Sequence, residues 1–207
     1  IHEMGRRDWY LNKEVVMQAE RGLRQRQYSG IGEVHFIAGF APDPENKVFL
    51  GLVELAKQFK VPMLIHVDAA DEKYFLKICQ RHPGVNIVLA HAGGNLYPEH
   101  IESILNKCTN VVIDFAARDP WRYGGLTNEK GLLLSGWQQI VLRYPDRFIT
   151  GTDPVWRVTR TQSWDQPDDG WDHFEKLLDY HKQWLAGLPE QVRNKITQEN
   201  VRKLLGK

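Results

Sequence analysis

Two patterns of hydrophobic residues alternate along the chain. Short and nearly continuous apolar runs, such as Val61, Met63, Ile65 and Val67 within residues 61–70, are typical of parallel strands that are covered on both faces. Longer stretches with apolar residues three and four positions apart predict amphipathic helices. The apolar runs predict strands near residues 31–37, 62–67, 86–91, 111–115 and 148–152.

The helical patterns fall between these strands and after the last one. They cover residues 12–27, 44–60, 71–84, 98–108, 136–147, 171–188 and 189–207. Pro98 is expected in the first turn of its helix, and Pro83 with Gly84 is expected to end another. Regular alternation of strands and helices predicts an α/β fold with a parallel sheet, in a single domain spanning residues 1–207.

An open doubly wound sheet and a (β/α)8 barrel both satisfy this alternation. No G-x-G-x-x-G fingerprint of dinucleotide binding follows a strand. Polar, chemically capable residues instead stand at the C-terminal ends of successive strands. These residues are Glu33, His35, His66, His91, Asp114 and Asp153. A barrel gathers the C-terminal ends of all its strands at one mouth, so this distribution favours the barrel.

Three of these residues end otherwise apolar lines on one face of a strand. His66 shares its face with Leu64, and His91 shares its face with Leu89, because alternate strand residues point the same way. Asp153 ends the last predicted strand in the same manner. Two imidazoles and a carboxylate at one mouth are suitable ligands for zinc, manganese or iron. Such an ion would lower the pKa of a bound water and polarise a substrate oxygen.

Composition narrows the choice of partner and compartment. Lys and Arg number 27 against 26 Asp and Glu, a balance that gives no reason to expect nucleic acid as a partner. No apolar run approaches the roughly 18 residues of a membrane helix, so no membrane association is expected. Cys79 and Cys108 are the only cysteines and do not make a disulfide framework, which favours a reducing compartment and a cytoplasmic location.

Five motifs in order carry a resemblance to a known family. They are "GIGEVHF", "MLIHVDA", "IVLAHAGGN", "NVVIDFA" and "RFITGTDP". Together they resemble the metal-dependent TIM-barrel amidohydrolase superfamily, and most of all its amidohydrolase-2 branch of hydrolases and non-oxidative decarboxylases. The closing "ITQENVRKLLG" resembles the last helix of that branch. The resemblance extends from about Gly30 to the end of the chain.

The resemblance implies roles for four residues. His66 matches the metal ligand of the family's fifth strand, and His91 matches the sixth-strand histidine, which is a ligand or a proton-transfer residue. Asp153 matches the eighth-strand aspartate, which binds metal and takes a proton from the attacking water. Glu33 stands where many members have a bridging carboxylate on the fourth strand. Asp153 and His91 are thus the expected catalytic residues, and all four are expected metal ligands.

The sequence departs from the family at its beginning. The family's His-x-His motif, which ends the first strand, is absent, and the predicted strands match the fourth to the eighth. We therefore expect an incomplete barrel that, without the two missing histidine ligands, binds a divalent metal weakly or not at all. Its open edges are expected to pair with a missing N-terminal segment or, in a homo-oligomer, with a second copy.

Loops after the strands are expected to build the substrate pocket. The residues expected to bind substrate there are Arg118, Trp121, Arg122, Trp156 and Arg157. His82 and His181 lie in predicted helices or turns and are expected at the surface. The expected activity is hydrolysis of an amide, ester or lactone of a small-molecule substrate. The alternatives are non-oxidative decarboxylation of a small carboxylic acid, and a non-catalytic barrel remnant or assembly subunit.

Overall fold

A parallel sheet of five strands forms the centre of the protein. The structure, a computed structural model, describes residues 8–39, 42–155 and 169–207. The strands are β1 (Ile31–Ile37), β2 (Met63–Asp68), β3 (Ile87–Leu89), β4 (Val111–Asp114) and β5 (Phe148–Ile149). They are adjacent in chain order, β1-β2-β3-β4-β5, and all pairs are parallel. This order is that of part of a (β/α)8 barrel, and it excludes the reversal of a doubly wound sheet.

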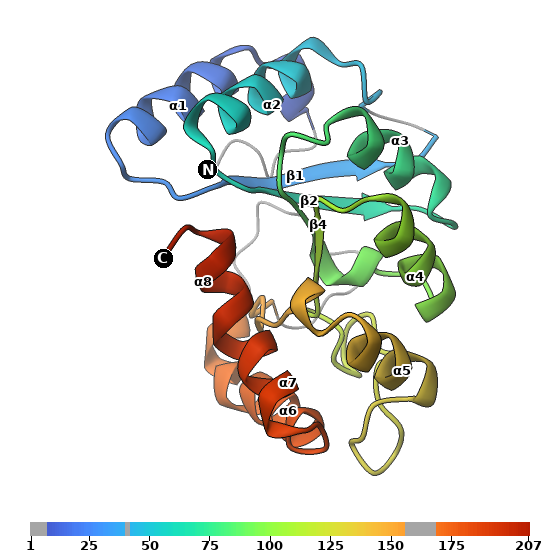
Figure 1. The fold of residues 1–207 in the computed structure, drawn as a ribbon. Helices are drawn as coiled ribbons and strands as arrows, with labels where there is room; N and C mark the ends of the chain where they lie inside the picture. The colour runs from blue at the N-terminus through green and yellow to red at the C-terminus, as the bar shows by residue number, and fades with distance from the viewer. Residues whose placement is uncertain (1–7, 40–41, 156–168) are drawn as a thin grey trace.

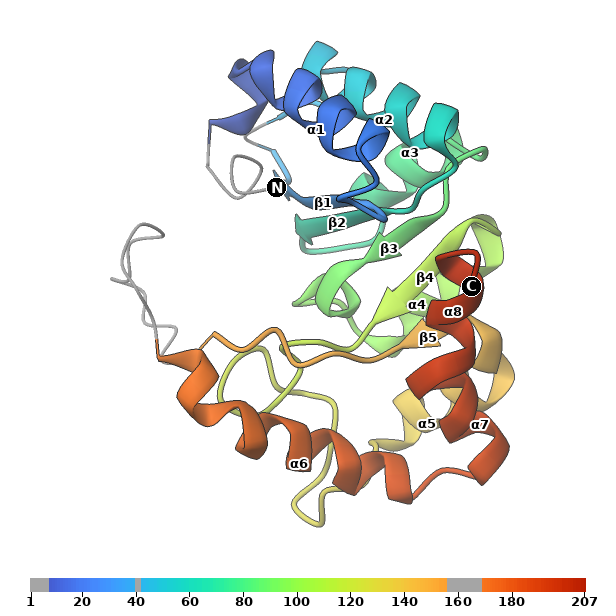
Figure 2. The same ribbon diagram turned by 90° about the vertical axis from the view of Figure 1, so that its left-hand side faces the viewer.

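Helices connect and flank the strands (Figure 1). They are α1 (Glu14–Arg24), α2 (Lys47–Phe59), α3 (Lys73–Arg81), α4 (Pro98–Lys107), α5 (Ser135–Arg143), α6 (Phe174–Ala186), α7 (Glu190–Asn194) and α8 (Asn200–Leu204). A π-helical turn, Lys195–Glu199, joins α7 to α8, and Pro98 begins α4 as expected. Figure 2 shows the strands as an arc, with α1 and α2 beside β1 and with α8 beside β5.

Aromatic side chains pack the last two strands against α6. The ring of Phe115 stacks on Phe148 at a centroid distance of 5.2 Å and meets the edge of Trp184 at 5.6 Å. All three side chains are fully buried. His82 and His181, expected at the surface, are also buried, because α3 and α6 turn these positions toward the core. The apolar spacing predicts which face of each helix packs against the core. His82 and His181 lie on those faces among the apolar residues, so they are buried with them.

Two strands are shorter than their apolar runs. β3 ends at Leu89, and the chain then turns through Ala90–Gly93 with φ of 56° at His91 and 48° at Ala92. β5 ends at Ile149, and Asp153 has φ of 45°. His91 and Asp153 therefore follow their strands and do not lie on them. The side-chain directions of His91 and Asp153 were predicted from the alternation of strand faces. That rule does not apply to either residue, because turns orient both side chains.

The two cysteines are joined, which corrects the expectation drawn from their number. Cys79 of α3 and Cys108 after α4 form a disulfide, with their Cα atoms 6.0 Å apart. The inference of a reducing compartment from unpaired cysteines thereby loses its support, and the cytoplasmic location stays a prediction. Among the described residues, no helix has the length and apolar character needed to cross a membrane.

The side chain of Asn110, which precedes β4, is hydrogen-bonded to the end of α3 and the loop after it, and its removal should destabilise the fold. Its side-chain amide donates to the carbonyls of Cys79, His82 and Val85 at 3.3, 3.0 and 2.9 Å. Asn110→Ala should lower the free energy of unfolding by about 1–3 kcal/mol, because the carbonyls lose their donor. Urea denaturation followed by tryptophan fluorescence measures this. Asn194→Ala, at an exposed position of α7, should cost no more than about 0.5 kcal/mol. An equal loss in both variants would contradict the assignment.

Candidate active site

A cavity of about 270 Å³ opens at the C-terminal ends of the strands. Its lining comes from β1, β2, the turn after β3, the loop after β4 and the segment after β5. The lining residues are Glu33, His35, His66, His91, Ala117, Trp121, Arg122, Tyr123, Asp153 and Val155. All four predicted metal ligands and two of the five predicted substrate-binding residues therefore lie around one cavity.

Close packing of β1 on β2 brings Glu33 into this cavity. A Cβ on Gly32 would lie 2.6 Å from the Cβ of Leu64, so only glycine fits there. The register between the two strands shifts between Ile31 and Val34, where Glu33 lies. Irregularities of this kind re-aim side chains near functional sites.

The Glu33 carboxylate is the centre of a histidine cluster. Its Oε1 atom lies 2.9 Å from Nδ1 of His66 and 3.1 Å from Nε2 of His91. Nε2 of His35 is 3.7 Å from the same oxygen, and the ring of His35 stacks on His66 at 4.6 Å. One carboxylate oxygen is thus within reach of three imidazoles from separate positions in the sheet.

His66 and His91 each place one ring nitrogen near Glu33 and the other ring nitrogen near a second oxygen atom. His91 places Nδ1 3.1 Å from the carbonyl of Ala116, and His66 places Nε2 3.0 Å from Oδ1 of Asp68. When each of these nitrogens carries the proton and donates it outward, the other nitrogen faces Glu33 with a free lone pair. Histidine ligands of metal ions are oriented in this way by a second hydrogen bond.

Burial and hydrogen bonding shift the pKa values of the cluster. Burial would raise the pKa of Glu33, but hydrogen bonds with His66 and His91 outweigh it and hold that pKa well below its usual range. Burial would lower the pKa of His66, but hydrogen bonds with Asp68 and Glu33 raise it to about 9. The pKa of His91 is likewise raised, by its hydrogen bond with Glu33 against the effect of burial. The carboxylate of Glu33 and the imidazoles of His66 and His91 thus stabilise one another's charged forms.

The geometry of the cluster fits a divalent ion. Glu33, His66 and His91 each offer a ligand atom, and these atoms lie within 4.8 Å of one another. Ligand bonds of about 2.0–2.2 Å place neighbouring donors of a tetrahedral site about 3.3 Å apart. The 2.9 and 3.1 Å separations between the carboxylate oxygen and the two nitrogens are close to that spacing. An ion would take the place of protons that the imidazoles share with Glu33.

Asp153 lies beside this cluster and outside the set of three. Its carboxylate shares the cavity, and Oδ2 is 3.4 Å from a terminal nitrogen of Arg122. Burial raises its pKa, and the nearby charge of His91 opposes the shift. Of the four predicted ligands, three are brought together and the fourth faces the same space. Asp114 is buried outside the lining and accepts a hydrogen bond from the amide of Ala116 at 3.0 Å.

The predicted substrate-binding residues are placed differently from one another. Trp121 and Arg122 line the cavity, whereas Trp156 and Arg157 lie outside the described residues. Arg118 does not line the cavity, contrary to expectation. Its guanidinium is buried, donates to the carbonyl of Gly94 and lies 5.0 Å from the ring of Trp137. The loop turns Arg118 inward, so its guanidinium packs against the core and lies outside the cavity lining.

Two residues around the cluster, Tyr123 and Asp68, were not among the predicted site residues. Tyr123 stacks on the His91 ring at 5.4 Å and forms part of the cavity wall. Asp68 orients His66, and its position two residues further along the same strand was the signal that could have identified it. Tyr123 had no such signal, because only the folded loop brings it to His91.

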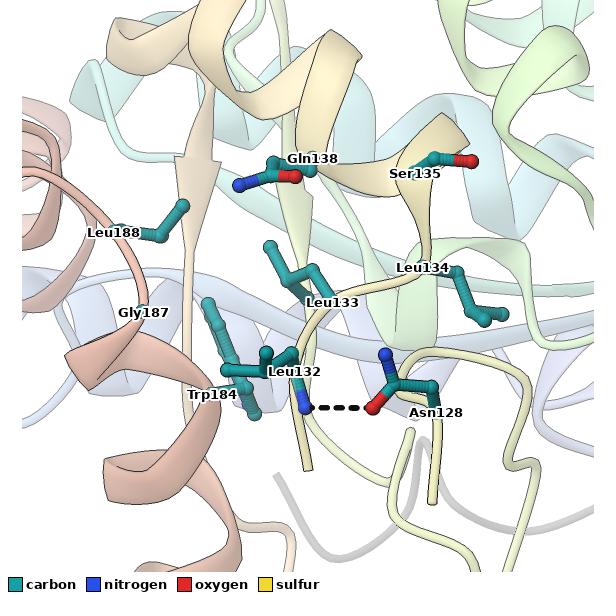
Figure 3. Close-up of a pocket in the computed structure, with 9 residues that line it drawn as sticks. All are labelled: Asn128, Leu132, Leu133, Leu134, Ser135, Gln138, Trp184, Gly187 and Leu188. Carbon is teal, nitrogen blue, oxygen red and sulfur yellow. Dashed lines mark hydrogen bonds between the residues drawn. The ribbon is translucent and has the colours of Figure 1, made fainter. Parts of the chain in front are cut away.

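A second cavity, of about 300 Å³, lies between the loop before α5 and the C-terminal end of α6 (Figure 3). Leu132, Leu133, Leu134, Trp184 and Leu188 supply most of its lining. None of the residues that line it has a titratable side chain, so it offers no acid, base or charged metal ligand.

Comparisons with known proteins agree with the fold. The sequence profile of the amidohydrolase family matches residues 12–207. No curated protein matches the chain. An uncharacterised TIM-barrel protein from Bordetella bronchiseptica is 13% identical, with a TM-score of 0.62. The matched region covers 94% of this chain and 63% of the Bordetella chain. The chain thus spans less than two thirds of that relative.

Two further solved structures have the same fold. A putative 2-pyrone-4,6-dicarboxylic acid hydrolase from Pseudomonas putida is 18% identical, with a TM-score of 0.60 over 93% of this chain and 67% of its own. The 5-carboxyvanillate decarboxylase from Novosphingobium aromaticivorans, solved with manganese, is 14% identical, with a TM-score of 0.55. The matched region covers 94% of this chain and 61% of the decarboxylase chain. Because the family profile covers almost the whole sequence, this chain belongs to the amidohydrolase family.

Proposed function

We propose that this chain carries the active site of a metal-dependent hydrolase that cleaves an amide, ester or lactone of a small molecule. The observation that carries the proposal is the convergence of Glu33, His66 and His91 in one cavity with Asp153. A divalent ion, zinc by preference and otherwise manganese or iron, would supply Lewis acidity toward a carbonyl oxygen and a water molecule there. Glu33, His66 and His91 would hold it.

The chain's own residues supply the proton transfers. Asp153 is close to the cluster, and its raised pKa makes it a better base than an exposed aspartate, so it would accept the proton of the attacking water. His91 keeps Nδ1 on the Ala116 carbonyl, which leaves Nε2 as its working atom, as ligand or as proton carrier. Trp121 and Tyr123 would form the wall against which substrate lies.

Decarboxylation is the second candidate, because the same fold holds a hydrolase in one structural relative and a decarboxylase in another. The assembly of the barrel decides whether either reaction is fast. Within the described residues, β1 pairs only with β2 and β5 only with β4, so each has a free edge. We propose that these edges pair with strands of an N-terminal segment or with a second copy in a homo-oligomer.

The test compares two reactions under controlled metal content. The 207-residue chain, and a version extended at its N-terminus by strands carrying His-x-His from a structural relative, are loaded with zinc or manganese. Lactone and aryl-ester cleavage and release of CO₂ from aromatic acids are measured. We expect slow cleavage by the chain alone and faster cleavage by the extended protein. A chelator should abolish both, and Asp153→Asn should lower the rate at least about 100-fold.

The control and the contradicting outcomes are specific. Asp146→Asn, at an exposed position before β5, should leave the rate unchanged. Release of CO₂ without ester or lactone cleavage would replace hydrolase by decarboxylase. A folded, metal-loaded, extended protein with neither activity would contradict an enzymatic role and would favour the assembly subunit.

A further inference from the structure

Arg122 ties the loop after β4 to the segment after β5. Its Nε and a terminal nitrogen donate to Oδ2 of Asp119 at 2.7 and 2.5 Å. The same terminal nitrogen donates to the carbonyl of Thr152 at 2.5 Å, and the other donates to the carbonyl of Asp153. The side chains of Arg122 and Asp119 are 3% and 0% exposed. Asp119 thus holds Arg122 in a buried ion pair within one loop, and the hydrogen bonds of Arg122 to two carbonyls join this loop to a segment about thirty residues further along the chain.

The guanidinium of Arg122 has no donor left for a substrate. An arginine side chain has five N–H donors. Nε donates to Asp119, one terminal nitrogen to Asp119 and Thr152, and the other to the carbonyl and the carboxylate of Asp153. A substrate carboxylate could be bound only by breaking these contacts and by leaving Asp119 buried without its counterion. The role first expected of Arg122, binding substrate, does not agree with this arrangement.

The contacts of Arg122 converge on the residue that the proposed function makes the base. Asp153 has φ of 45°, a left-handed conformation that residues other than glycine rarely adopt. Hydrogen bonds to the carbonyls of the two peptide units that flank Asp153, those of Thr152 and of Asp153 itself, hold it in this conformation. Asp119 also accepts a hydrogen bond from the amide of Trp121 at 3.2 Å, so the same ion pair fixes part of the cavity wall.

We propose that Arg122, held by Asp119, is a positioning residue that sets the Asp153 carboxylate in the cavity. The proposal rests on the proposed function, in which Asp153 takes the proton. Lysine would not substitute, because its three donors sit on one nitrogen and do not span a carboxylate and two carbonyls. Arg122 acts on the reaction through Asp153 and does not touch substrate.

The kinetic test separates positioning from substrate binding. In the extended, metal-loaded protein, Arg122→Lys and Asp119→Asn should each lower kcat about 10- to 100-fold and change KM less than about threefold. A substrate clamp predicts the opposite: KM rises steeply in Arg122→Lys and changes little in Asp119→Asn. That result would overturn the proposal, as would an unchanged kcat.

Arg147→Lys is the matched control. Arg147 also donates to two backbone carbonyls, those of Val111 and Cys108, both at 2.6 Å, but at the opposite end of the sheet. Its replacement removes the same kind of contact without touching Asp153, so kcat should stay within about twofold of wild type. An equal fall of kcat in this variant would assign the effect to general loosening of the fold and would overturn the positioning role.

A structural readout keeps the proposal testable without turnover. In crystal structures of the 207-residue chain, Arg122→Lys should move Asp153 out of the left-handed region, and Arg147→Lys should not. The Nε–H signal of Arg122 should be protected from exchange in NMR spectra of wild type and lost in Asp119→Asn, which serves alone if Arg122→Lys does not fold. Absence of turnover in wild type would contradict the proposed function only. An unmoved Asp153 in Arg122→Lys would contradict the positioning role.

Discussion

His91→Ala and Glu33→Gln should each weaken zinc binding by the 207-residue chain at least about 100-fold, from an affinity that is already low. Structural zinc sites gain about 10–16 kcal/mol from four protein ligands, so each ligand contributes several kcal/mol. The described cluster brings three ligand atoms together, on Glu33, His66 and His91. The chain alone should therefore lose its metal on dialysis. Calorimetric titration and metal analysis after dialysis measure both expectations.

His35→Gln is the matched control for this loss. His35 lines the same cavity and stacks on His66, but it does not belong to the three-residue set. Its replacement should change zinc affinity less than about fivefold. A loss equal to that of His91→Ala would place His35 among the ligands. Stoichiometric zinc that survives dialysis of the wild-type chain would show that the residues present are sufficient, against the expectation of weak binding.

His181 should make the fold sensitive to acid. Its side chain is 2% exposed, and Nδ1 lies 3.1 Å from Nε1 of Trp184 and 3.0 Å from the hydroxyl of Thr150. The indole nitrogen can only donate, so Nδ1 is an acceptor and the proton is on Nε2, which is buried without a partner in the described structure. A second proton on Nδ1 would break these hydrogen bonds and would place a charge in the core.

The sign of the pH effect follows from the direction of this shift. Burial lowers the pKa of His181 from 6.5 to about 4. Between these values the unfolded chain takes up a proton that the folded chain does not, so stability falls as pH decreases from about 6.5 to 4. The loss is on the order of 3 kcal/mol when complete. Denaturant unfolding at a series of pH values measures it.

The comparison with His181→Asn isolates this contribution. Asparagine can still accept from Trp184 but does not titrate, so wild type should lose on the order of 3 kcal/mol relative to this variant between pH 7 and pH 4. Burial raises the pKa of Asp114 to about 6, which acts in the opposite direction but equally in both proteins. His100→Asn, on the partly exposed side of α4, should follow wild type. Parallel pH profiles of wild type and His181→Asn would exclude the assignment.

Sequence patterns determined the elements and their order. All five strands lie within the predicted apolar runs or within one residue of them, since burial of a parallel strand on both faces leaves a local signature. His66 was placed correctly because it lies on β2 itself, where the two-residue period fixes the direction of a side chain. The resemblance extended this to the family and to a set of four expected ligands, of which Glu33, His66 and His91 lie together in the structure and Asp153 lies beside them.

Tertiary structure decided what depends on turns and on distant neighbours. His91 and Asp153 reach the cavity through left-handed turns, which no apolar periodicity encodes. Arg118 and Arg122 are four residues apart in one loop, yet one packs on Trp137 and the other holds Asp153. The sequence could not separate them, because the carbonyls, rings and carboxylates that compete for a guanidinium lie up to about thirty residues away. Their positions are fixed only when the whole sheet and its helices pack together.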